Sequence, residues 1–167
     1  GGRLMIVGYE SGDQQILKNI KKGATVDMAR RFTTNAHKLG LKIHADFIIG
    51  LPGESRESIE TTINFAKELD CETIQVSLAH PYPGTEFYDH AEKNGLIQLG
   101  ASMTDEGGHQ LPNIIHPGLD RGELALDFLE RLDGETGDEF AWAMVLPALD
   151  PIRCDPRFVA LVERRKI

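Results

Sequence analysis

The chain has 167 residues, of which 41% are hydrophobic and 26% are charged, and these values are typical of a globular protein. Its net charge of −8 excludes the basic surface that attracts nucleic acids and anionic membranes, so we expect neither as a partner. The two cysteines, Cys71 and Cys154, lie far apart, which excludes a Cys-x-x-Cys cluster or zinc motif. No apolar segment reaches the ~18–20 residues of a membrane span, and we expect a cytoplasmic protein.

Strands and helices alternate in the first part of the chain. Short apolar segments that end in glycine or proline predict strands, and Thr25, Ser55 and Thr85 are typical residues to begin the helices after them. The expected strands cover residues 4–7, 41–49 and 73–79, and the expected helices cover 14–20, 26–39, 56–69 and 86–93. This order predicts an α/β fold with parallel strands and right-handed crossovers.

The pattern changes after Ile97. Residues 99–120 are rich in Gly, Pro, Asp and His without a clear period, which predicts a long loop or strap. Helices are expected over 120–132, 138–146 and 155–165. We therefore divide the chain into three strand–helix units at 1–98, a strap at 99–120 and a helical tail at 121–167.

Alternation along the strands predicts which side chains face the helices. Ile43, Phe47 and Ile49 share one apolar face, so His44 and Asp46 should lie on the opposite face. The side chains expected on this polar face are Glu10, His44, Asp46, Gln75 and Ser77. Glu10, Gly50 and His80 come at the carboxyl ends of strands, where parallel barrels collect their active sites.

Three segments carry a family resemblance. They are Val7-Gly-Tyr-Glu-Ser-Gly12, Phe47-Ile-Ile-Gly-Leu-Pro-Gly-Glu54 and His80-Pro-Tyr-Pro-Gly-Thr85. In this order they resemble the fourth, fifth and sixth strands of a radical SAM barrel, and the cobalamin-binding hopanoid-biosynthesis proteins most of all. The resemblance covers residues 3–120. It implies the C-terminal half of such a barrel, a three-stranded parallel half of a TIM-like barrel followed by a helical appendage.

The same resemblance implies which residues would touch SAM and what the chain is missing. Glu10, Ile48, Gly50 and Tyr82 match positions that contact SAM or its adenosine. The sequence has neither Cys-x-x-x-Cys-x-x-Cys nor the Gly-Gly-Glu segment of the family. We therefore predict a truncated radical SAM fragment that holds no iron–sulfur cluster, retains only residual contacts for SAM and performs no radical chemistry alone. No catalytic residue is assigned, and the tail is expected to be of foreign or frame-changed origin.

Two alternatives remain open. The first is a metal-dependent hydrolase of phosphate or carboxylate esters, in which His, Asp and Glu bind zinc, manganese or iron with an open position for water. Its candidate ligands are Glu10, His44, Asp46, His80, His109 and His116. A metal-free face in which His44 and Asp46 only form hydrogen bonds competes with it. The second is a non-catalytic scaffold, since a half-barrel exposes sheet edges that predict a homodimer unless the tail covers them.

Overall fold

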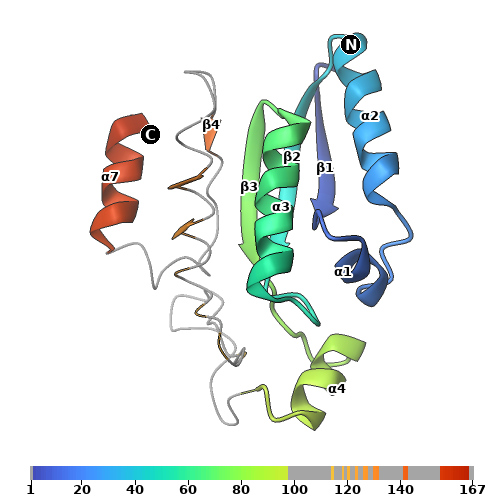
Figure 1. Ribbon diagram of the computed structural model, residues 1–167, viewed down its shortest axis with the longest axis vertical. Coiled ribbons are helices and arrows are strands. Elements are labelled where there is room, and N and C mark those ends of the chain that lie inside the picture. Colours follow the sequence, from blue (N-terminus) through green and yellow to red (C-terminus); the bar gives the residue numbers. More distant parts are fainter. Residues whose placement is uncertain are drawn as a thin grey trace.

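The computed structural model describes residues 2–97, 114, 118, 120, 123, 126–127, 130–131, 141–142 and 155–165. A parallel four-stranded sheet of order β1-β2-β3-β4 lies at its centre (Figure 1). The strands are β1 (Leu4–Glu10), β2 (Lys42–Ile49), β3 (Thr73–Leu78) and β4 (Ala141–Trp142). The predicted α/β fold with three parallel strands is therefore confirmed, and a short fourth strand is added to it.

Each helix of the first 97 residues begins at a side-chain cap. The helices are α1 (Gln14–Asn19), α2 (Val26–Lys38), α3 (Arg56–Leu69) and α4 (Glu86–Lys93), and their caps are Asp13, Thr25, Ser55 and Thr85. Every cap accepts a hydrogen bond from a backbone N–H of the first turn, which has no partner within the helix. Helices α1 and α4 lie at the end of the sheet toward which the strands point (Figure 1).

The two faces of the sheet differ as the alternation predicts. Ile43, Phe47 and Ile49 of β2 are at most 1% exposed on the face that packs against the helices. On the opposite face, His44 and Asp46 of β2 lie beside Thr73 and Gln75 of β3 and are only half-buried. We call this second face the polar face.

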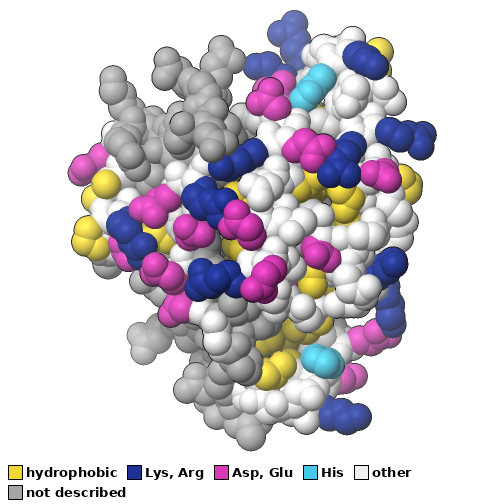
Figure 2. Space-filling model, in the orientation of Figure 1, with side chains coloured by type: hydrophobic (Ala, Val, Ile, Leu, Met, Phe, Trp, Pro, Cys, Tyr) yellow, Lys and Arg dark blue, Asp and Glu magenta, His cyan; other side chains and the backbone are white. Residues whose placement is uncertain are grey.

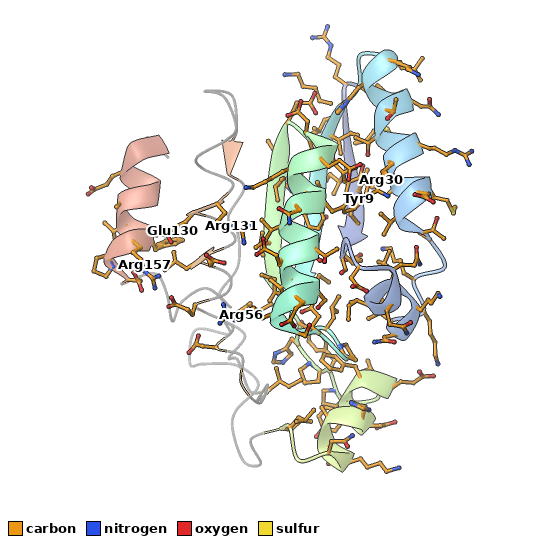
Figure 3. All side chains as sticks on the ribbon, in the orientation of Figure 1. Tyr9, Arg30, Arg56, Glu130, Arg131 and Arg157 are labelled. Carbon is orange, nitrogen blue, oxygen red and sulfur yellow. The ribbon has the colours of Figure 1, made fainter. Side chains whose placement is uncertain are left out.

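Three aromatic rings form the centre of the core. Tyr9 stacks on Phe47 with ring centroids 5.9 Å apart, and Phe65 of α3 meets both rings edge-on. Arg30 of α2, which lies near Tyr9 in Figure 3, has its guanidinium carbon 5.4 Å from the ring centroid of Phe65. The same guanidinium pairs with Glu68. Helix α3 is buried along Ile59, Ile63, Phe65 and Ala66, as its apolar spacing predicts.

Helix α2 buries only part of the apolar positions that repeat along it with a helical spacing. Of the apolar positions at residues 28, 32, 36 and 39, only Ala36 is buried, while Met28 is 53% and Phe32 38% exposed. The helix instead buries Thr33, whose hydroxyl lies 2.5 Å from the hydroxyl of Tyr9. The buried phenol requires a polar partner, and this requirement decides which side of α2 faces the core.

The tail contributes a strand where a helix was expected. Ala141 and Trp142 fall within the predicted helix 138–146, yet their backbone forms β4 beside Thr73 and Ile74. Pairing with the free edge of β3 outweighs helical propensity here, because an unpaired edge leaves backbone groups without partners. Helix α7 (Pro156–Arg165) agrees with the prediction over 155–165.

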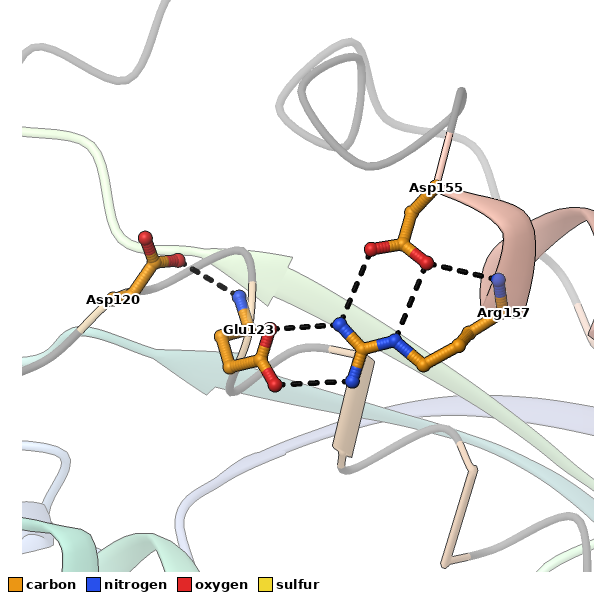
Figure 4. A network of polar contacts seen from close by, with 4 residues as sticks. All are labelled: Asp120, Glu123, Asp155 and Arg157. Atoms are coloured by element: carbon orange, nitrogen blue, oxygen red, sulfur yellow. Dashed lines mark hydrogen bonds and ion pairs between the residues drawn. The ribbon is translucent and has the colours of Figure 1, made fainter.

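One ion pair joins the tail to α3, and another joins two parts of the tail. Arg131 forms two hydrogen bonds with Glu60 of α3, and Arg157 of α7 binds both carboxylate oxygens of Glu123 at 3.0 and 2.7 Å (Figure 4). Asp120 accepts the backbone N–H of Glu123, as predicted for a helix that begins there. Positive and negative side chains are interspersed on this side of the molecule (Figure 2).

The predicted strap falls almost entirely outside the described residues. Within it, Ile114 forms an antiparallel bridge with Ile97 and packs with Ala91 of α4 in a small apolar cluster. In the part of the chain that the structure describes, none of the helices has the length and apolarity needed to cross a membrane.

Candidate functional site

A cleft of about 480 Å³ opens at the carboxyl ends of the strands. Apolar side chains make up much of its wall, and charged side chains lie at its rim. The lining residues are Glu10, Asn19, Ile20, Lys21, Lys22, Ile48, Leu51, Pro52, Glu86, Phe87 and His90. A concave, mostly apolar cleft with a few polar groups is the usual form of a small-molecule site.

Glu10 enters the cleft through a local irregularity of β1. The pairing of β1 with β2 shifts between Gly8 and Glu10, and Glu10 adopts a φ of +67°, which is unusual for a residue with a side chain. Its carboxylate accepts a hydrogen bond of 2.6 Å from the Nζ of Lys22, and only 17% of the side chain is exposed. Such strain concentrates at functional sites, so Glu10 is the strongest single candidate.

The turn after β2 is held by its own side chains. Glu54 accepts the backbone N–H groups of Gly50 and Leu51 at 2.5 and 3.1 Å. Asn19 of α1 donates to the carbonyl of Pro52 at 2.9 Å and so ties the turn to the opposite wall of the cleft. Glu54, the last residue of the Gly-Leu-Pro-Gly-Glu segment, therefore stabilises the conformation of the turn through these two hydrogen bonds.

A second polar group lies on the polar face, and its two residues, His44 and Asp46, are not among those that line the cleft. The Nδ1 of His44 is 2.6 Å from the hydroxyl of Thr73, and its Nε2 is 3.3 Å from Oδ1 of Asp46. Burial raises the pKa of Asp46 above its usual range; His44 and Lys22 act in the opposite direction, and Glu10 adds to the rise. The imidazole of His44 and the carboxylate of Asp46 are thus two potential metal ligands on the same face of the sheet.

The structure separates the four residues predicted to contact SAM. Glu10 and Ile48 both line the cleft. Gly50 lies just beyond β2 with its N–H bound to Glu54, and Tyr82 is 51% exposed with its ring packed edge-on against His80 at 5.0 Å. Neither of these two is among the residues that line the cleft.

Sequence reasoning missed several residues of the cleft. Lys22, Phe87 and His90 line the cleft, and none of them is among the candidate site residues of the sequence. The turn after α1 carries Lys22 to the strand ends, and α4 carries Phe87 and His90 there. No local sequence pattern predicts that these residues lie close together. The only available signal was the position of both helices directly after strand ends, where parallel sheets bind ligands.

The predicted metal ligands do not meet in the described part of the chain. His109 and His116 lie outside it, and among the described residues no group of three or more His, Cys, Asp or Glu side chains could hold a metal ion. Among the four predicted ligands that the structure describes, His44 and Asp46 lie in contact, and the carboxylate of Glu10 forms an ion pair with Lys22.

Comparison with known proteins identifies what the chain is similar to. A family model of the Radical SAM superfamily matches residues 2–66, which lie in the N-terminal part of the chain. The predicted resemblance extends over residues 3–120 and implies the C-terminal half of a barrel. The match is confined to residues 2–66 and supports the coarser statement that this N-terminal part of the chain is radical SAM-like.

Curated relatives include methyltransferases. An uncharacterized methyltransferase of Pyrococcus horikoshii is 41% identical over 97 residues, which are 58% of this chain and 21% of that protein. The bacteriochlorophyllide d C-12(1)-methyltransferase of Chlorobaculum tepidum is 32% identical over 90 residues, 53% of this chain and 20% of that protein. The chain thus spans about a fifth of the length of these relatives.

A solved structure agrees with the fold. The radical S-adenosylmethionine methyltransferase TsrM of Kitasatospora setae, with cobalamin and a 4Fe–4S cluster bound, matches with a TM-score of 0.66 and 20% identity. The match covers 91% of this chain and 35% of that one. The three parallel strands therefore correspond to part of a radical SAM barrel.

Proposed function

We propose that this chain is a fragment of a cobalamin-dependent radical SAM methyltransferase that retains one wall of the adenosyl cleft and performs no radical SAM chemistry alone. The observation that carries the proposal is the cleft at the strand ends, which Glu10 and Ile48 line together. These are two of the four residues to which the family resemblance assigns SAM contacts. The methyltransferase names among its relatives support the same class of parent protein.

The shape and chemistry of the cleft suit an adenosyl group. Ile48, Leu51 and Phe87 offer apolar surface for a purine ring, and aromatic stacking with a base is favourable. Glu10 can accept hydrogen bonds from the two hydroxyls of a ribose if Lys22 shares its carboxylate. The volume of about 480 Å³ is within the range of small-molecule sites.

An iron–sulfur cluster does not fit the residues of this chain. A radical SAM cluster supplies the electron that cleaves SAM, and it requires three thiolates. The sequence has two cysteines. Cys71 is 4% exposed, and burial raises the pKa of its thiol to about 12, so it is a poor source of thiolate. The residues of this chain therefore do not provide the ligands of such a cluster.

The hydrolase alternative receives less support. It requires three ligands, and His44 with Asp46 supplies two at the polar face, while the described residues offer no third. The metal-free interpretation, in which His44 is held by Thr73 and Asp46, accounts for the same contacts. We therefore do not propose hydrolysis as the function.

Adenosine binding tests the proposed cleft. We expect titration calorimetry or ligand-observed NMR to detect adenosine binding, weakened at least several-fold by Ile48→Asp, which places a charge in the apolar wall. The matched control is Leu39→Asp, at an exposed apolar position that does not line the cleft. Equal binding by both variants would overturn the assignment of the cleft.

A second experiment tests the chemistry. The chain is incubated anaerobically with iron and sulfide, then with SAM and dithionite. We expect no 5′-deoxyadenosine by mass spectrometry. Its formation in proportion to protein would show that the fragment cleaves SAM, and would overturn the second half of the proposal.

A further inference from the structure

The ion pair of Glu10 and Lys22 occupies a defined place above the sheet. The Nζ of Lys22 lies 2.6 Å from Oε1 of Glu10, and the two side chains are only 32% and 17% exposed. A Cβ built on Gly8 would lie 2.5 Å from this carboxylate oxygen and 3.3 Å from the Nζ. The pair therefore fills the space over Gly8, and glycine at this position leaves room for it.

The turn at the end of α1 fixes the backbone of Lys22. Its N–H donates to the carbonyl of Leu17 at 3.0 Å. The N–H of Lys21 donates to the carbonyl of Lys18, also at 3.0 Å, and Lys21 adopts a left-handed conformation with a φ of +54°. The two bonds and the left-handed residue form a Schellman motif, in which glycine is the usual residue. The ammonium group of Lys22 thus reaches Glu10 from a backbone that is held in place.

A second carboxylate lies beside this pair. Gly8 is the partner of Asp46 in the register of β1 and β2, and the carboxylate of Glu10 lies over Gly8. Burial is the main cause that raises the pKa of Asp46; the charge of Glu10 adds to the rise, whereas His44 and Lys22 oppose it. If Lys22 were absent, repulsion from Asp46 would displace the flexible side chain of Glu10.

From these contacts we infer that Lys22 is a positioning residue of the cleft, which holds the carboxylate of Glu10 where it can accept the hydroxyls of a ribose. Both residues line the cleft. The inference rests on the proposed adenosyl cleft and adds the class of ligand that it selects, namely nucleosides with free ribose hydroxyls. A carboxylate has two oxygens with several acceptor positions, so one can remain with Lys22 while the other accepts from the ligand.

The preference for adenosine over 2′,3′-dideoxyadenosine, which lacks both hydroxyls, measures this role. A hydrogen bond to a charged group changes an affinity by about tenfold or more, and we expect titration calorimetry of the full chain to give a preference of this size. Lys22→Met keeps a long side chain without the charge and should reduce the preference to about twofold or less. Lys22→Arg, which keeps the charge, should retain most of it. The control is Lys18→Met, at an exposed position of α1 outside the lining of the cleft, and it should leave the preference unchanged.

A second variant displaces the ion pair without removing a charge. In Gly8→Ala the new Cβ meets only the ends of two flexible side chains, which can move, so the protein should still fold. We expect this variant to lose the preference as Lys22→Met does. Circular dichroism checks the fold of every variant.

A double-mutant cycle tests whether Lys22 acts through Glu10. Glu10→Gln should lower the preference, and Lys22→Met added to it should change the preference by less than about twofold. An equal effect of Lys22→Met in both backgrounds would mean that Lys22 contacts the ligand itself, and would overturn the inference.

Other outcomes separate this inference from the proposed cleft. If adenosine binds and Ile48→Asp weakens its binding, but the parent shows no preference or Lys22→Met leaves the preference unchanged or increases it, the inference fails and the cleft remains. If the parent chain does not bind adenosine, the proposed cleft is wrong and the inference falls with it.

Discussion

The hydroxyl of Thr62 is the connection between α3 and the segment that carries Glu10. It accepts the backbone N–H of Gly12 at 3.0 Å, lies 3.0 Å from the hydroxyl of Ser11, and donates to the carbonyl of Ser58. Thr62 is 1% and Ser11 0% exposed, so water cannot replace these partners. We therefore predict that Thr62→Val, which keeps the shape and removes the hydroxyl, destabilises the protein strongly.

The magnitude follows from the groups left behind. A buried N–H without an acceptor costs about 1–3 kcal/mol, and loss of the pair with the Ser11 hydroxyl adds about 0.5–1.5 kcal/mol. Ser11 retains its bond from the backbone N–H of Asp13, which limits the second contribution. We expect a decrease in the free energy of unfolding of about 2–4 kcal/mol, a large fraction of the 5–15 kcal/mol typical of a domain.

Urea denaturation of the parent chain and the variant measures this decrease. The matched control is Thr61→Val, one position away on the exposed side of α3. The hydroxyl of Thr61 donates a hydrogen bond to the carbonyl of Glu57 in the preceding turn of the same helix. It should change the free energy of unfolding by less than about 0.5 kcal/mol. If Thr62→Val costs no more than Thr61→Val, the reasoning that this hydroxyl holds the β1–α1 turn to α3 is refuted.

Two further predictions concern the same region and the core. Gly12→Ala should cost about 1–3 kcal/mol, because its Cβ would lie 2.5 Å from the Cβ of Phe65; Gly2→Ala, with no atom within 4 Å, should be neutral in urea titrations. Because burial raises the pKa of Cys71 from 9.0 to about 12, its contribution to stability is complete below pH 9 and is lost as pH rises toward 12. Urea midpoints across this range, in a Cys154→Ser background, should fall with pH more steeply than those of a Cys71→Ala variant; parallel curves would contradict the assignment.

The elements that sequence reasoning predicted well are those with a strong local signal. Helix α3 was predicted with the bounds that the structure has, because Ser55 caps it and its apolar positions repeat with a helical period. Alternation in β2 correctly assigned Phe47 to the core and His44 to the polar face. Of the four residues that the family resemblance assigns to SAM, Glu10 and Ile48 line the cleft; alternation along the strands also predicted Glu10 at a strand end, but it did not single out Ile48.

The failures arise where distant partners decide the outcome. The orientation of α2 depends on the bond between Tyr9 and Thr33, which are 24 positions apart. Strand β4 has two residues, too few for any period, and it exists because β3 presents an edge. Lys22 and His90 reach the cleft only because two helices meet there, so their role follows from tertiary structure.

The order in which the strands pair has a consequence for the chain during its synthesis. Strands β1, β2 and β3 are complete once Leu78 is made, but β4 begins only at Ala141. At about 5–20 residues per second, a ribosome needs several seconds to deliver it. During this interval the edge of β3 that β4 later pairs with is open, and strands of other nascent chains can pair with it. The edge of β3 is therefore open to aggregation for as long as the synthesis of residues 79–140 takes.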